Sequence, residues 1–312
     1  MEKQKTFLVI DSNSLIHRAY HALPPLTTKK GQEVGAIYGF LLGLFKVLKE
    51  FKPDFVAAAF DSSGPTFRHK EFKAYKAKRP KIPPQLSWQI EQTKEILEAF
   101  GIPVFEKKGF EADDIIGTIS TLVPKKQIFP EAKIIILSGD LDTLQLVKPH
   151  TYVCFPQKGV KGTILYNPEL VREKYSGLEP AQLVDFRALR GDPSDNIPGV
   201  KGVGQKTAIA LIKEFKTLEN LYFEIENHTE RSEKIKPKLR ELLLKHKEDA
   251  FFSKQLSQIA CNVPIEFSLE KCRFGRYDEQ KIKTLFEKLE FFSLIKKLPE
   301  IFNSKVSENL LK

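Results

Sequence analysis

Residues 109–120 read GFEADDIIGTIS, and this stretch places three acidic side chains directly before an apolar run with helical periodicity. Glu111, Asp113 and Asp114 fall within four residues, where a helix is predicted to begin. Acidic residues are favoured in the first turn of a helix because they oppose its dipole. Helix capping explains the stretch when it is taken alone, and the surrounding sequence decides whether it has a further role.

Three other apolar runs each end on aspartate: FLVID at 7–11, FVAAAFD at 55–61 and KIIILSGDLD at 133–142. Short continuous apolar runs are typical of strands buried on both faces. Segments with helical periodicity separate them, at 36–51, at 86–100 and from Ala112 onward. The alternation of strands and helices predicts an α/β fold with a central parallel sheet and flanking helices.

The carboxyl ends of parallel strands share one edge of a sheet, where ligands bind in a crevice. We therefore expect the strand-end aspartates to converge there, together with the acids that begin the helix after Gly109. The predicted cluster comprises Asp11, Asp61, Glu111, Asp113, Asp114, Asp140 and Asp142. So many carboxylates repel one another unless cations neutralise them, and oxygen ligands select Mg²⁺ or Mn²⁺. The alternative is a set of turn and cap aspartates scattered over the surface.

A basic segment, TFRHKEFKAYKAKRPK at 66–81, follows the second predicted strand. Phe67, Phe72 and Tyr75 alternate with its lysines and arginines, so the segment can track a phosphate backbone while its rings stack on unpaired bases. A solvated charged helix is the alternative. Gly64 and Pro65 before the segment and Pro80 within it favour a mobile element without its own core.

The second half begins with two short predicted strands, TYVCF and TILY, and then becomes mostly helical. Its informative part is GDPSDNIPGVKGVGQKTAIALIKEF at 191–215. The glycines predict a tight hairpin whose backbone amides, with the next helix start, can meet DNA phosphates independently of base sequence. This hairpin contains Gly199, Lys201, Gly202, Gly204 and Lys206. A purely structural turn is the alternative.

Composition bounds the function. The 312 residues carry a formal net charge of +10, which suits a polyanionic partner, and 41% are hydrophobic, as expected of a globular protein. No apolar run reaches the length of a membrane span, and no signal-peptide pattern opens the chain. Three cysteines without metal-like spacing indicate reduced thiols, so we expect a cytoplasmic protein that binds no membrane.

Four motifs, in this order, resemble the 5′ nuclease domain of bacterial DNA polymerase I and its free-standing relatives in the flap endonuclease family. They are DSNSLIHRAYHALPPL, FRHKEFKAYKAKRP, GFEADDIIGT and DNIPGVKGVGQKTA. The resemblance covers nearly the whole chain. It implies a PIN-like α/β catalytic domain at 1–175 with a basic arch at 64–84, a helical DNA-binding region at 176–300 with a helix-3-turn-helix at 191–215, and a tail at 301–312.

The resemblance also assigns the acids to two metal sites, for two Mg²⁺ or Mn²⁺ ions. It places Asp11, Asp61, Glu111 and Asp113 at the first site, and Asp140, Asp142 and Asp192 at the second. Asp114 and Asp195, the latter just ahead of the hairpin, are implied to support either ion. From the residues alone, Asp192 and Asp195 could equally be helix-cap or turn residues. A potassium ion at the helix-3-turn-helix is a further expectation.

By the same resemblance Lys76 and Arg79 contact the scissile phosphate. DNA contacts are implied for Arg18, Tyr20, Arg68, Lys73 and Tyr75, and for the residues of the glycine hairpin. The implied activity is 5′-3′ exonuclease and 5′ flap endonuclease cleavage that leaves a 5′ phosphate and a 3′ hydroxyl, as in primer removal and repair. We expect a monomer acting on DNA 5′ ends, flaps and RNA primers, either beside a separate polymerase or as the front of a longer one.

Two other functions remain open from the sequence. A PIN-type ribonuclease shares some strand-end acids but has no need of the hairpin. A non-catalytic DNA-binding module explains the hairpin and the basic segment, with the acids as caps.

Overall fold

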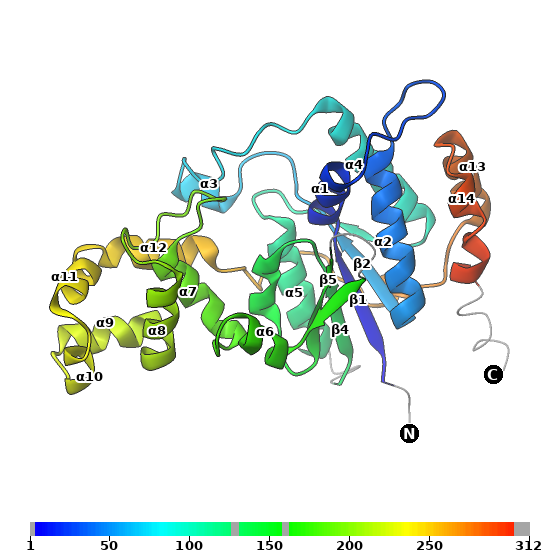
Figure 1. Cartoon of the computed structure of the whole chain (residues 1–312). Coiled ribbons are helices and arrows are strands. Elements are labelled where there is room, and N and C mark those ends of the chain that lie inside the picture. Colours follow the sequence, from blue (N-terminus) through cyan, green and yellow to red (C-terminus); the bar gives the residue numbers. More distant parts are fainter. Residues whose placement is uncertain (1–3, 126–130, 158–161, 303–312) are drawn as a thin grey trace.

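A computed structural model of the chain describes residues 4–125, 131–157 and 162–302. At its centre lies one six-stranded sheet in the order β3-β2-β1-β4-β5-β6 (Figure 1). The strands are β1 (Thr6–Asp11), β2 (Phe55–Ala59), β3 (Val104–Phe105), β4 (Lys133–Leu137), β5 (Thr151–Pro156) and β6 (Thr163–Tyr166). All neighbouring strands are parallel except β5 and β6.

Helices cover both faces of the sheet, and this explains why its strands are continuously apolar. Alternate residues of β1 enter different cores: Val9 packs on the side of α5 (Ala112–Lys125), and Ile10 packs on the side of α2 (Gly35–Phe51) and α4 (Pro84–Ala99). In the register of the sheet, Asp11 at the end of β1 lies beside the last residue of β2. The predicted α/β class and parallel centre are confirmed.

Two elements at the carboxyl edge of the sheet were not predicted. Helix α1 (Ser12–Ala22) starts immediately after β1, with the Asp11 carboxylate as its N-cap. The two-residue strand β3 adds a parallel edge next to β2. A strand this short carries no periodicity from which it could be predicted.

The second half of the described chain is mostly helical, as expected. Its elements, with two short ones from the first half, are α3 (Phe67–Glu71), η1 (Leu141–Leu146), α6 (Pro168–Lys174), η3 (Pro180–Gln182), α7 (Leu183–Arg190), α8 (Gln205–Phe215), α9 (Leu218–Glu226), α10 (Glu230–Glu233), α11 (Pro237–Lys245), α12 (Lys247–Ser257), η4 (Glu270–Cys272), α13 (Glu279–Lys288) and α14 (Phe292–Ile295).

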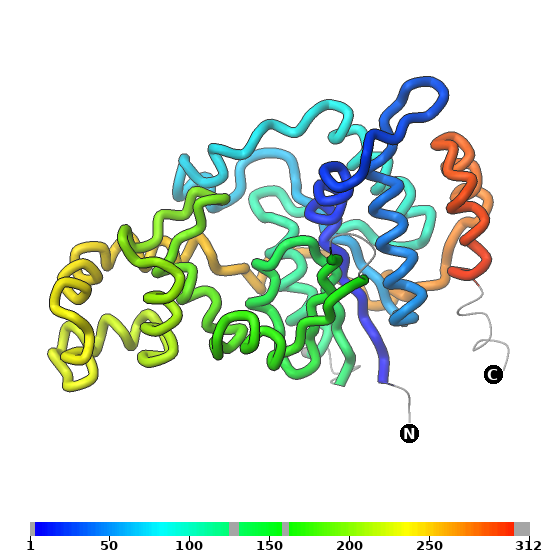
Figure 2. Tube along the Cα trace, in the orientation of Figure 1, coloured from blue at the N-terminus to red at the C-terminus, as the bar shows by residue number. Residues whose placement is uncertain are grey.

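The helical half divides in space (Figure 2). Helices α8–α11 extend away from the sheet, whereas α13 and α14 return to its other side and pack near α2 and α4. Ile301 and Phe302 are buried in that same core, so the expected tail does not begin at 301; its remainder, 303–312, lies outside the described residues. No helix in the described ranges is long and apolar enough to cross a membrane.

Candidate active site

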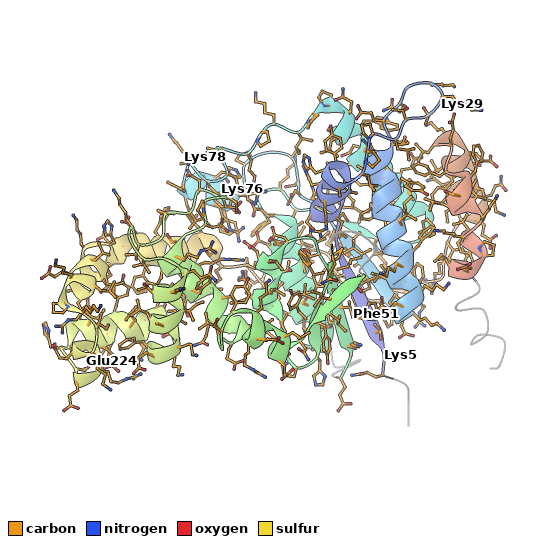
Figure 3. The ribbon with its side chains drawn as sticks, in the orientation of Figure 1. Lys5, Lys29, Phe51, Lys76, Lys78 and Glu224 are labelled. Atoms are coloured by element: carbon orange, nitrogen blue, oxygen red, sulfur yellow. The ribbon has the colours of Figure 1, made fainter. Side chains whose placement is uncertain are left out.

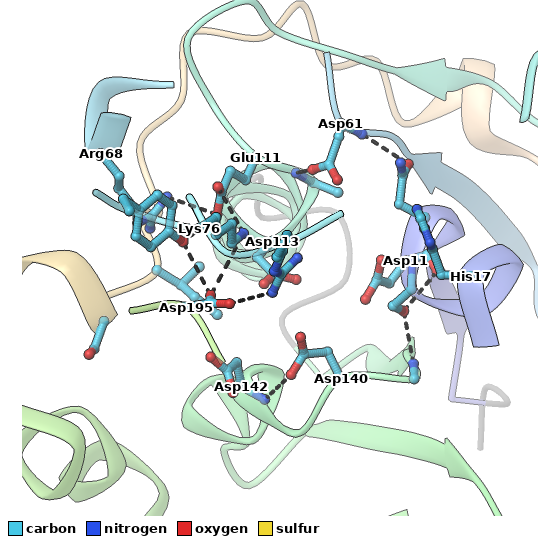
Figure 4. A pocket seen from close by; sticks show the side chains of 18 of the residues that line it. Asp11, His17, Asp61, Arg68, Lys76, Glu111, Asp113, Asp140, Asp142 and Asp195 are labelled. Carbon is cyan, nitrogen blue, oxygen red and sulfur yellow. Dashed lines mark hydrogen bonds and ion pairs between the residues drawn. The ribbon is translucent and has the colours of Figure 1, made fainter. Parts of the chain in front are cut away.

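A crevice of about 510 Å³ opens at the carboxyl edge of the sheet. Seven carboxylates line it, contributed by strand ends, by the start of α5 and by the loop before the glycine hairpin (Figure 4). They are Asp11, Asp61, Glu111, Asp113, Asp140, Asp142 and Asp195. The structure thus brings together seven of the nine predicted acids, from segments far apart in sequence.

Several of these acids also begin helices. One oxygen of Asp11 accepts a hydrogen bond from the Ser14 amide at 3.2 Å, and the other accepts one from the Ser138 hydroxyl at 2.5 Å. Asp140 accepts from the first turn of η1, and Asp61 accepts from the Ala112 amide of α5 at 2.8 Å. Capping and clustering are therefore not alternatives here, because the caps themselves orient the carboxylates at the crevice.

Asp114 lies outside the crevice, whereas Arg68 lines it but directs its guanidinium to Asp114. Asp114 is fully buried, does not line the crevice, and accepts two hydrogen bonds of 2.8 Å from the Arg68 guanidinium. Arg68 is 2% exposed and also donates to the carbonyls of Leu256 and Gln258. This ion pair ties α3 to α5 and to the end of α12. Its geometry therefore argues against a metal-ligand role for Asp114 and a direct DNA contact for Arg68.

The two acids before the hairpin differ from each other. Asp192 lies outside the crevice lining, and its carboxylate accepts hydrogen bonds from the amide and hydroxyl of Ser194, as in an Asx turn. Burial alone would raise the pKa of Asp192, but these hydrogen bonds outweigh it and lower the pKa overall. Asp195 does line the crevice, where it pairs with Arg79.

Lys76 and Arg79 stand among the carboxylates. The Lys76 ammonium lies 2.9 Å from Glu111 and 3.8 Å from Asp195 (Figure 4). The Lys76 amide also donates to the Asp195 carbonyl, and Lys76 has a positive φ of 53°. The basic segment is thus held over the crevice by the same acids that line it.

The basic segment is not the coreless element that the sequence predicted. Tyr75 is 3% exposed, packs with Ile197 and Leu256, and donates its hydroxyl proton to Glu111 at 3.1 Å. Phe72 packs edge-on against Phe252. Base stacking on the buried Tyr75 is therefore blocked in this conformation, whereas Phe72 is half-buried and keeps part of its surface accessible.

The lysines of the basic segment other than Lys76 face solvent. Lys70, Lys73 and Lys78 are exposed, and Lys78 projects outward from the ribbon whereas Lys76 points inward (Figure 3). Exposed cations of this kind are available to a phosphate backbone.

Four carboxyls at the crevice have raised pKa values, and burial is the main cause in each, including Asp61. Burial raises the pKa of Asp11 to about 6 and that of Asp142 to about 8, and the charge of Asp140 adds to both shifts. Burial also raises the pKa of Asp113, followed by the charges of Asp11 and Asp140. Like charges held together away from water are the cause, and a bound cation would relieve both effects.

The donor set fits divalent cations. Asp113 has neither a hydrogen bond nor an ion pair with any described residue, so a half-buried carboxylate faces the crevice without a partner. Elsewhere Lys76, Arg79 and Arg187 neutralise neighbouring carboxylates. In the described ranges no three His, Cys, Asp or Glu side chains already form one ligand set, so binding an ion requires these side chains to turn toward it.

The glycine hairpin lies beyond the crevice. Lys201, Gly202, Gly204 and Lys206 are exposed, whereas Gly199 is buried. A Cβ on Gly199 would come 2.2 Å from the Gly191 amide nitrogen, so this glycine is required by packing. The exposed part keeps its amides and lysines accessible, as a phosphate-binding hairpin requires.

Two predicted DNA-contact residues, Arg18 and Tyr20, lie on α1. Arg18 lines the crevice, but it donates to the Pro156 carbonyl at 2.6 Å and lies over the Phe155 ring. Tyr20 faces a separate small pocket beside Leu23 and does not reach the crevice. Asn13 and His17 line the crevice without having been predicted. Asn13 and His17 are four residues apart, so they lie on the same face of a helix. This could have been recognised from the sequence only if α1 had been predicted as a helix.

Comparisons with known proteins agree with this architecture. The family described as "5'-3' exonuclease, N-terminal resolvase-like domain" matches residues 6–176, and "5'-3' exonuclease, C-terminal SAM fold" matches 178–280. DNA polymerase I of Bacillus caldotenax is 42% identical over 95% of this chain and 32% of its own length. That of Bacillus subtilis (strain 168) is 42% identical over 96% and 33%. The chain spans about a third of the length of these relatives.

Solved structures show the same fold at low identity. A T5 5′-exonuclease with bound divalent zinc superposes with a TM-score of 0.66 at 18% identity, covering 91% of this chain and 99% of the other. The catalytic core of Rad2 in complex with DNA substrate gives 0.62 at 18%, covering 96% and 92%. Together with the matches over both halves of the chain, these findings show that the protein belongs to the 5′-3′ exonuclease family.

Proposed function

We propose that this chain is a divalent-metal-dependent 5′-3′ DNA exonuclease and 5′ flap endonuclease. The observation that carries the proposal is the convergence of seven carboxylates on one crevice, beside a basic segment whose Lys76 and Arg79 reach the same carboxylates. Acids that gather metal ions and bases that meet phosphate are the two requirements of phosphodiester hydrolysis. A non-catalytic DNA-binding module has no need of an unpartnered carboxylate such as Asp113.

Two Mg²⁺ or Mn²⁺ ions would be held by the acids that line the crevice. We assign Asp11, Asp61, Glu111 and Asp113 to one ion and Asp140 and Asp142 to the other, with Asp195 in support. Asp192 joins the second set only if its turn opens. When bound, such ions activate water as Lewis acids and offset charge on the reacting phosphodiester.

The chain's own cations act on the substrate in this proposal. Lys76 and Arg79 would exchange their carboxylate partners for the non-bridging oxygens of the scissile phosphate, where they stabilise developing negative charge. Ser14 and Ser138 hold Asp11 in place through the hydrogen bonds described above. The exposed hairpin around Gly202 and Lys206 would grip duplex DNA through its backbone, so cleavage would depend on DNA structure more than on sequence.

The finer assignments follow from the same proposal. The products would carry a 5′ phosphate and a 3′ hydroxyl, and the substrates would be 5′ ends, 5′ flaps and RNA primers on DNA. We propose that the chain acts as a monomer in the bacterial cytoplasm, in primer removal and repair, with a polymerase supplied in trans or in the same polypeptide. A potassium ion at the hairpin remains part of the proposal.

The test is a flap assay. A 5′-labelled flap should be cut near its junction in Mg²⁺ and not in EDTA, and a single-stranded RNA of equal length should be cut far more slowly. Equal cleavage of the RNA would instead favour a PIN-type ribonuclease. DNA binding without any metal-dependent cleavage would reduce the protein to a binding module.

A further inference from the structure

One wall of the crevice carries a row of polar side chains that no role described so far uses. Asn13, His17 and His21 recur at four-residue intervals along α1, so they lie on one face of the helix. All three line the crevice. At 1.5 Å per residue the row spans about 12 Å, long enough to follow a strand beyond a single phosphate.

The hydrogen-bonding groups of this row are largely unused. The Asn13 side-chain oxygen accepts from the Asp61 amide at 3.1 Å, which fixes the side chain and leaves its NH₂ group free. Neither ring nitrogen of the half-buried His17 forms a hydrogen bond within the described ranges, although most buried polar groups find partners. His21 forms none there either, but its side chain is exposed to water. Arg18, between them in sequence, also lines the crevice, where it donates one hydrogen bond to the Pro156 carbonyl and lies over the Phe155 ring.

The row faces the basic segment across the carboxylates. Figure 4 shows His17 beside Asp11, whereas Lys76 and Asp195 lie on the other side of the crevice. His17 is nevertheless close enough to Asp61 and Arg79 to be influenced by their charges. A strand with its reacting linkage over the carboxylates must therefore pass between two walls, one with Lys76 and Arg79 and one with these amide and imidazole donors.

We propose that His17 donates a hydrogen bond to a phosphate of the bound DNA strand next to the scissile linkage, with Asn13 and His21 extending the contact along α1. The inference rests on the proposed nuclease function and adds a phosphate subsite to it. An imidazole suits this place because it keeps an N–H donor even when neutral. The His17 ring can therefore donate to a phosphate without a permanent positive charge, whereas the charge of Lys76 binds it to Glu111.

The test couples a protein change to a DNA change. His17→Phe keeps a ring but removes the donor, and a neutral methylphosphonate replaces one phosphate at a time on either side of the scissile linkage. Binding of each 5′ flap is measured by fluorescence anisotropy in EDTA, so that the readout does not depend on cleavage. His17→Phe should weaken binding of the unmodified flap about tenfold, as for a hydrogen bond to a charged group.

Coupling identifies the contact. At one methylphosphonate position the loss of affinity should be clearly smaller in His17→Phe than in the wild type, because the same hydrogen bond is already absent. His17→Gln, which keeps a donor, should recover part of the affinity. Losses that add at every position, or His17→Phe affinity equal to the wild type, would overturn the inference.

Two controls keep the outcomes separate. His150→Phe changes an exposed histidine that directly precedes β5, at the opposite edge of the sheet, and should bind every flap as the wild type does. Unchanged melting temperatures show that the variants fold. Wild-type cleavage of the unmodified flap in Mg²⁺ tests the proposed function by itself, so its failure is distinguishable from a failure of the His17 contact.

Discussion

Replacing Asp11 with asparagine should stabilise the metal-free protein near neutral pH, although it removes a residue assigned to the metal site. Burial raises the pKa of Asp11 from 3.8 to about 6, so the folded chain holds this proton more tightly than the unfolded chain does. Between pH 4 and 6 the unfolded state loses the proton first, and the stability of the fold therefore falls as the pH rises.

The size of the effect follows from the shift. About two pKa units correspond to about 3 kcal/mol, which is fully lost above pH 6. Asparagine carries no charge and keeps an oxygen acceptor for Ser14, so Asp11→Asn should recover much of this amount in EDTA at pH 7.5. For a chain of this length the gain corresponds to about 5 °C in melting temperature.

Differential scanning calorimetry at pH 4, 5, 6 and 7.5, in EDTA and in Mg²⁺, measures both parts of this prediction. In EDTA the two proteins should converge at pH 4 and diverge toward pH 7.5. Mg²⁺ should stabilise the wild type increasingly with pH, because the ion competes with protons for the carboxylates, and it should stabilise Asp11→Asn less. The raised pKa of Asp142, about 8, extends this rise of the Mg²⁺ effect into the alkaline range.

The exposed Glu98→Gln change is the matched control and should leave the pH profile unaltered. The reasoning fails if Asp11→Asn is less stable than the wild type at pH 7.5 in EDTA. It also fails if Mg²⁺ stabilises both proteins equally at every pH, since Asp11 would then contribute nothing to binding the ion.

Three further predictions concern catalysis and the hairpin. Asp140→Asn should reduce single-turnover flap cleavage at least a hundredfold while flap affinity changes less than about threefold, because affinity comes mainly from phosphate contacts elsewhere; near wild-type cleavage in saturating Mg²⁺ would remove Asp140 from the site. Gly199→Ala should lower the melting temperature strongly, since its Cβ would collide with the backbone of Gly191. Gly202→Val strains a backbone φ of +95° but meets only the Leu242 side chain, so it should cost less stability and also weaken duplex binding; equal loss of stability in both would assign the whole hairpin to folding. Lys76→Ala should slow cleavage more than it weakens binding, whereas Lys73→Ala should mainly weaken binding and reduce its salt dependence by about one phosphate contact; the same behaviour in both would withdraw the catalytic role of Lys76.

Local sequence patterns were enough to predict the sheet and the edge at which the acids meet. Buried parallel strands must be apolar throughout, and their carboxyl ends must share one edge, so FLVID, FVAAAFD and KIIILSGDLD predicted the positions of Asp11, Asp61 and Asp140. The glycine hairpin was predictable for a similarly local reason, because only glycine adopts its backbone conformations freely and packs closely against another backbone.

Which of two neighbouring side chains lines the crevice and which is buried in the core depends on contacts between distant parts of the chain. Asp113 and Asp114 are adjacent on α5, where one residue turns a helix by about 100°, so one faces the crevice and the other faces inward. The inward position is tolerable only because Arg68, 46 residues away in sequence, meets Asp114 there. Tyr75 likewise packs against Ile197 and Leu256, so it is not available to DNA bases. These contacts join distant parts of the chain, and no local sequence pattern predicts them. Local rules therefore fix the backbone that brings the acids together, whereas partners distant in the chain determine which of them remain free to bind an ion.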